Sequence, residues 1–91
     1  MYKKNLINLF NPGTQNHKIV QHILKQGHAY NFEFPGMGIL SYTRRISEIR
    51  LELGYVLFDI VATRIENTGT YVYRIVKIKK TDLTDYLYQV A

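Results

Sequence analysis

In the middle of the chain the spacing of apolar residues changes from that of a helix to that of β-strands. This change constrains the fold more than any other feature. Four apolar side chains recur at the spacing of one helix face: Tyr42, Ile46, Ile49 and Leu53. Gly54 follows them and is a typical C-terminal stop. Residues 55–65 and 70–80 are then rich in β-branched and aromatic side chains, and residues 66–69 have the composition of a turn. The pattern predicts a helix over 41–53 followed by an antiparallel hairpin, and therefore an α+β fold.

A further helix is predicted in the N-terminal half. Thr14 can accept a hydrogen bond from a free backbone amide of a helix that begins at Gln15, and Gly27 supplies its end. The apolar positions between them have helical spacing: Ile19, Val20, Ile23 and Leu24. Residues 28–39 fit either a short strand and a loop or one distorted helical turn. The two glycines and one proline in residues 35–38 favour the loop.

The length of 91 residues suits one small domain with a single hydrophobic core. We divide it into an N-terminal arm over 1–13, a domain over 14–80 and a short C-terminal helix over 81–91. Residues 3–10 within the first segment suit either an arm or a short helical turn. In that last segment Thr81 is the predicted cap, and Asp82 and Asp85 suit the positive end of a helix dipole. The final helix is expected to pack either on the domain or on a partner subunit.

The charge balance favours polyanionic partners. Twelve Lys and Arg residues against seven Asp and Glu residues give a formal net charge of +5. The lack of cysteine excludes disulfides and thiolate catalysis and suits a reducing cytosol. No apolar run approaches the roughly 18 residues of a membrane span, and the N-terminus does not resemble a secretion signal. We therefore expect a cytoplasmic protein, in the host cytoplasm if it is viral, without a membrane partner.

No group of residues indicates catalysis or metal binding. His17, His22 and His28 lack the i, i+4 spacing that places two imidazoles on one helix face. The carboxylates form no recognisable catalytic pair, and the sequence has neither a serine-centred elbow nor a phosphate-binding loop. We expect a protein that is not an enzyme and that needs no cofactor and no metal.

The order of helix, irregular segment, helix and hairpin resembles the winged helix-turn-helix, phage-type helix-turn-helix domain family. Eight positions within residues 14–79 carry the resemblance: Gln15, Gly27, Arg45, Ile46, Ile49, Arg50, Gly54 and Tyr73. The resemblance implies a winged helix-turn-helix with a C-terminal β-hairpin wing. It also implies duplex DNA binding, as by a phage transcriptional regulator or an excisionase-like accessory factor. The family's second helix corresponds to residues 29–39, where this sequence is a poor helix former.

The resemblance implies that the helix over 41–53 enters the major groove of DNA. Its candidate DNA-binding residues are Ser41, Thr43, Arg44, Arg45, Ser47 and Arg50. Arg44 points most directly away from the predicted core and either contacts DNA or pairs with Glu48 one turn later. Arg45 and Arg50 border the apolar stripe, where Arg45 can instead form a structural salt bridge. For Ser41 the alternative is a role as helix cap only.

The hairpin adds Arg64, Asn67 and Arg74 as candidate DNA-binding residues near the wing tip. Charged strand residues also protect a sheet edge from aggregation, which is the structural alternative. Both hairpin faces carry apolar residues, whereas one layer of helices covers only one face. The second face must therefore meet the arm, the final helix or another chain.

Two further alternatives remain open at the sequence level. The second hairpin face and an outward-pointing Leu51 suit a homodimer. The same exposed apolar groups suit a phage-encoded protein that binds and inhibits or modulates a host protein.

Overall fold

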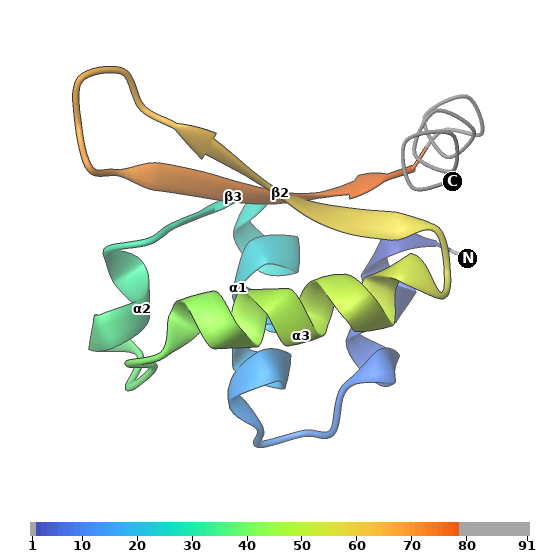
Figure 1. The fold of residues 1–91 in the computed structure, drawn as a ribbon. Coiled ribbons are helices and arrows are strands. Elements are labelled where there is room, and N and C mark those ends of the chain that lie inside the picture. The colour runs from blue at the N-terminus through green and yellow to red at the C-terminus, as the bar shows by residue number, and fades with distance from the viewer. Residues whose placement is uncertain (1, 79–91) are drawn as a thin grey trace.

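The computed structural model describes residues 2–78 and shows an α+β fold with a three-stranded antiparallel sheet (Figure 1). The elements follow in the order η1 (Lys3–Leu9), α1 (Gln15–Gln26), β1 (Ala29–Tyr30), α2 (Glu33–Gly36), α3 (Tyr42–Gly54), β2 (Phe58–Arg64) and β3 (Tyr71–Lys77). The predicted α+β class is confirmed. The helix predicted over 81–91 lies outside the described residues.

Helix α1 has the limits that its sequence predicts. The Thr14 hydroxyl oxygen accepts a hydrogen bond from the backbone N–H of His17 at 3.2 Å. Gly27 adopts a left-handed conformation with φ 87°, and its N–H donates to the Ile23 carbonyl. Only a glycine takes this conformation without steric cost, so α1 ends at Gly27.

Residues 28–39 contain both a strand and a helical turn, so the loop favoured from the sequence is wrong there. Ala29 pairs with Tyr73 of β3, which makes β1 an edge strand of the sheet. The single turn of α2 ends in a Schellman arrangement, in which the N–H of Ile39 donates to the Phe34 carbonyl and the N–H of Gly38, at φ 81°, donates to the Pro35 carbonyl. The glycines therefore end a short helix that Phe34, fully buried, holds in the core.

Helix α3 buries the predicted stripe but does not end as predicted. Ile46, Ile49 and Leu53 are buried, whereas Gly54 is a helical residue without positive φ. The chain leaves α3 through a turn of i→i+3 hydrogen bonds, and the left-handed residue is Leu57 with φ 62°. This turn delays β2 to Phe58, three residues after the predicted start.

The hairpin forms in the register that pairs Ile60 with Ile75. Its tip is the predicted turn, where the N–H of Ile65 donates to the Thr70 carbonyl at 2.9 Å and Asn67 has φ 61°. Asparagine tolerates this left-handed conformation better than most side chains, which explains its place there.

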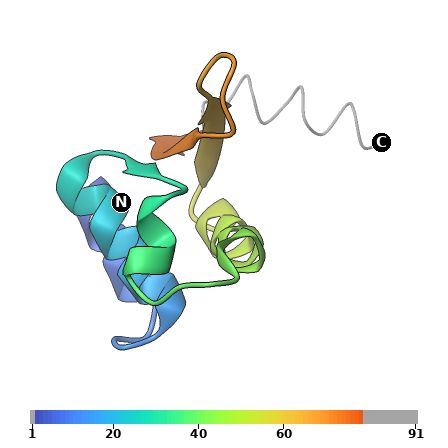
Figure 2. The ribbon, with the colours of Figure 1, turned by 90° about the vertical axis from the view of Figure 1, so that its left-hand side faces the viewer.

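The helices cover one face of the sheet and leave the other open among the described residues. In Figure 2 the sheet stands above α1 and α3, which lie beside each other. Directly paired residues share a face, so Ile60 and Ile75 point to the helices and are fully buried. On the opposite face Val61 pairs with Arg74, and both are exposed. Val72, on the same face as Arg74, is nevertheless buried. Of the three coverings predicted for this second face, the arm packs into the core instead, and the final helix or another chain stays a prediction.

Of the arm and the short helical turn predicted for residues 3–10, the structure contains the helical turn η1, and this turn contributes to the core. η1 packs Leu6, which is fully buried, against the same hydrophobic cluster as α1, and Phe10 follows it into that cluster. Residues 3–10 are thus held by burial rather than left as an extended arm.

Two leucines on α3 test this packing with the same chemical change. Leu53 is fully buried, whereas Leu51 is 65% exposed. Leu53→Ala should lower the free energy of unfolding by about 2–5 kcal/mol, because it removes buried methyl groups and leaves a cavity. Leu51→Ala should change it by less than about 0.5 kcal/mol. Urea denaturation of both variants measures the difference, and equal losses would contradict this arrangement of α3.

Candidate nucleic-acid interface

The exposed face of α3 lies between two sides of the helix that pack against other elements, one against α1 and the other against β2. Figure 2 shows α3 nearly end-on, with α1 on one side and the hairpin above it. The acidic Glu52 is also exposed on α3. Thr43, Arg44, Ser47 and Leu51 are exposed on the remaining side. These four residues are called the α3 face below. Its charge comes from Arg44, which has no hydrogen bond or ion pair within residues 2–78.

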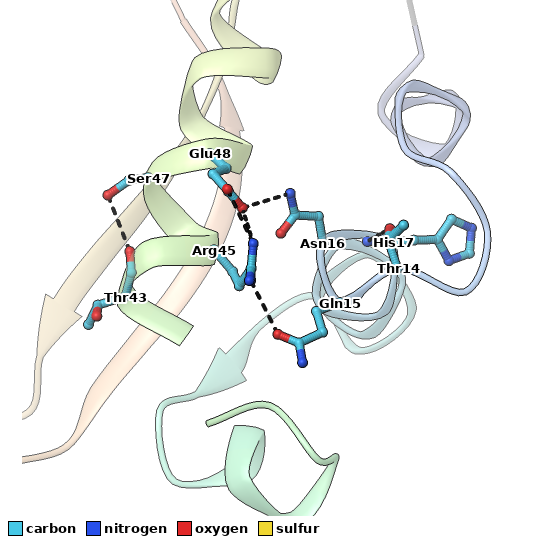
Figure 3. Close-up of polar contacts among 8 residues, drawn as sticks. All are labelled: Thr14, Gln15, Asn16, His17, Thr43, Arg45, Ser47 and Glu48. Atoms are coloured by element: carbon cyan, nitrogen blue, oxygen red, sulfur yellow. Dashed lines mark hydrogen bonds and ion pairs between the residues drawn. The ribbon is translucent and has the colours of Figure 1, made fainter. Parts of the chain in front are cut away.

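Arg45 lies on the flank that faces α1, where it connects two helices (Figure 3). Its guanidinium donates to Glu48 at 2.7 Å and to the side-chain oxygen of Gln15 at 3.2 Å. Asn16 donates to the same Glu48 carboxylate at 3.3 Å. Glu48 therefore pairs with Arg45 and not with Arg44, because the carboxylate is turned toward α1. Arg45 was predicted either to contact DNA or to form a structural salt bridge, and the structure shows the salt bridge with Glu48.

The surroundings of Glu48 favour its charged form. Hydrogen bonds from Arg45 and then from Asn16 hold the pKa of the Glu48 carboxyl below its ordinary value. The carboxylate thus accepts hydrogen bonds from Asn16 on α1 and from Arg45 on α3, and it is partly exposed to water.

Arg50 lies on the other flank and covers part of the exposed edge of β2. Its guanidinium donates to Asp59 at 3.1 Å and to the Ile60 carbonyl at 2.9 Å, while the Ile60 N–H donates to the Asp59 carboxylate at 2.8 Å. Both backbone groups of Ile60 are thereby satisfied on an edge strand. Such capping opposes strand addition by another molecule.

The hydroxyl residues of α3 have different roles. Ser41 precedes the helix, but its side chain makes no capping hydrogen bond, so the predicted cap is not formed. The Ser47 hydroxyl donates to the Thr43 carbonyl at 3.2 Å, as Figure 3 shows. Thr43 and Ser47 are both exposed, and each hydroxyl oxygen can still accept a hydrogen bond.

The three hairpin candidates do not share one surface. Arg64 pairs with Tyr71 on the helix-facing side of the sheet, and its guanidinium donates to the Thr68 carbonyl at 2.9 Å. Arg74 pairs with Val61 on the opposite side. Asn67 is exposed in the turn between the strands. The structure thus brings Arg64 and Asn67 to the hairpin tip and leaves Arg74 on the open sheet face.

Asn31 was not singled out in the sequence, yet it holds the hairpin to the body of the protein. Its amide donates to the Gly69 carbonyl at 3.2 Å, and its oxygen accepts from the N–H of Tyr71 at 3.0 Å. The partners are about 40 positions away along the chain, so no local pattern signals this contact.

In comparisons with protein-family models, curated proteins and solved structures, nothing matches the chain. Within residues 2–78, no three His, Asp or Glu side chains are grouped so that they could hold a metal ion. None of the helices in this part of the chain has the length and apolar character to cross a membrane.

The Glu48 contacts give a pH-dependent prediction. Arg45→Gln should raise the pKa of Glu48 toward its ordinary value, because it removes the largest hydrogen bond to the carboxylate. Since the folded-state pKa is depressed, the stability from Glu48 is present above its unfolded pKa and is lost as the pH falls through the folded value. Carbon-13 NMR of the side-chain carboxyl measures the titration directly.

Arg44→Gln is the matched control, because the Arg44 guanidinium makes no hydrogen bond to the Glu48 carboxylate and acts on it only through its charge. It should move this pKa less than Arg45→Gln does. Equal shifts in the two variants would show that charge alone, and not the hydrogen bond, sets the pKa.

Proposed function

We propose that this protein is a winged-helix protein that binds duplex DNA through the α3 face and the hairpin tip. The proposal rests on one observation. Arg44 is exposed on a helix whose flanks are occupied, and its side chain has no partner within residues 2–78. The order α1, α2, α3 and hairpin supports the winged-helix assignment. The net charge of +5 supports a polyanionic partner.

The α3 face suits the major groove, which is about 12 Å wide and admits one helix. Arg44 would donate to a guanine edge or to a phosphate, and the Thr43 hydroxyl would donate to a phosphate oxygen. The Ser47 hydroxyl, whose hydrogen is directed at the Thr43 carbonyl, could accept from a base amino group. The single turn of α2 cannot orient α3 as a full second helix does. Instead the pairs Arg45 with Glu48 and Arg50 with Asp59 anchor α3 on both flanks.

The hairpin would contribute to the backbone contacts. Its tip carries Arg64 and Asn67, and it projects beyond α2 in Figure 1. Asn31 limits its movement through the two hydrogen bonds to Gly69 and Tyr71. A charge held in this way can neutralise a phosphate beside the groove that α3 enters. We leave Arg74 out of the proposed interface, because it lies on the open sheet face.

A second candidate function rests on the apolar groups beside Arg44. Leu40 is 81% exposed, Leu51 65% and Tyr55 77%. Exposed apolar side chains of this size around one helix also suit a protein partner, such as a host protein. The two functions differ in the residue on which they depend, since a protein partner would require Leu51 and a duplex would require Arg44.

The binding test compares two variants that remove one positive charge each. Arg44→Gln should weaken binding to duplex DNA by about 5- to 150-fold, corresponding to about 1–3 kcal/mol if a base contact is lost. Lys25→Gln at the end of α1 should weaken it much less. Fluorescence anisotropy with labelled duplexes over a range of salt concentrations measures both affinities.

The salt series also distinguishes the alternatives. Affinity should fall steeply with added salt, because phosphate contacts release counterions. Equal effects of Arg44→Gln and Lys25→Gln would reduce the interaction to nonspecific attraction by net charge. No binding at low salt would contradict the proposal and favour the protein partner.

A further inference from the structure

A groove of about 560 Å³ lies between η1 and α1. In Figure 2 these two helices lie on the side away from the exposed face of α3. Half-buried Ile7 and Leu24 line the groove and give it apolar surface. Its location separates it from the residues of the proposed DNA interface.

The groove also has a one-sided charge. Lys3, Lys4 and Lys25 line it together with Gln21, and no acidic side chain belongs to the lining. All three lysines are exposed, and none forms a salt bridge within residues 2–78. Like charges around one cavity repel each other, so an acidic occupant with apolar side chains would be favoured.

We propose that the occupant is the C-terminal segment of the same chain, residues 81–91. This segment has Asp82 and Asp85 and contains no Lys or Arg. Leu83, Tyr86 and Leu87 recur at i, i+3 and i+4, the spacing of one helix face. The sequence therefore offers the two features that the groove requires, namely negative charge and an apolar surface beside it.

The chain leaves the sheet at a suitable place. The N–H of Ile78 donates to the Leu57 carbonyl at 2.9 Å, which fixes the last described residue. The end of β3 and the beginning of η1 lie at the same end of the molecule in Figure 1. Residues 79–81 can extend to about 10 Å, and a helix over 82–88 adds about 10 Å more.

Such binding would neutralise lysines on the η1 side and cover Ile7 and Leu24. It would leave Arg44 on the α3 face unaffected. The proposal does not depend on DNA binding, since both the groove and the segment are defined without it.

Paramagnetic NMR of the full-length chain tests the proposal, and the natural absence of cysteine allows a single labelling site. A nitroxide on Lys18→Cys, one turn before Gln21 on α1, should cause loss of amide signal from residues 83–87. A nitroxide on Thr43→Cys, on the α3 face, should leave those signals intact. No loss from the Lys18→Cys label, or equal loss from both labels, would overturn the proposal.

Charge reversal tests the electrostatic part. Lys4→Glu with Lys25→Glu should abolish the signal loss, and adding Asp82→Lys with Asp85→Lys should restore it. If reversal has no effect, the charge complementarity is refuted. A mixture of isotope-labelled and spin-labelled chains identifies a second copy, because signal loss in the mixture requires binding between chains and would overturn binding within one chain.

Discussion

Burial of one stripe of α3 is the constraint on which the rest of the structure depends. Ile46, Ile49 and Leu53 enter the core between α1 and the sheet, and this fixes the rotation of the helix about its own axis. The side opposite the stripe must then face solvent. Arg44 is exposed as a consequence of hydrophobic packing, and the chemistry available at the α3 face follows from that packing.

The three arginines of α3 carry the same chemical group but have different contacts, because each lies on a different side of the helix. Arg45 faces α1 and joins Glu48 and Gln15, and Arg50 faces β2 and joins Asp59. Water reaches both ion pairs, so their value lies in orientation more than in stability. They hold the flanks of the helix, whereas the guanidinium of Arg44, between them on the surface, has no hydrogen-bond partner in the described part of the chain.

The two proposed interfaces lie on different sides of the protein. DNA would approach α3 and the hairpin tip, and the C-terminal segment would occupy the groove between η1 and α1. Each has its own charged residues, so each can be altered without the other. This separation makes the two proposals independently testable and would allow both surfaces to be used at once.

The sequence by itself determined α1, the apolar stripe of α3 and the hairpin turn, because helical period, caps and turn residues act over a few positions. It did not determine the helical turn at Glu33–Gly36, whose proline and glycines form a helix end once Phe34 is buried. It gave the candidate arginines but not their partners. Only the tertiary structure decided that Glu48 pairs with Arg45, that Arg50 caps β2 and that Arg64 and Arg74 lie on opposite sheet faces. Arg45 and Glu48 are i, i+3 neighbours on one helix, but their orientation depends on hydrogen bonds with Gln15 and Asn16 of α1. The other outcomes are set by the rotation and register of packed elements, which no local pattern encodes.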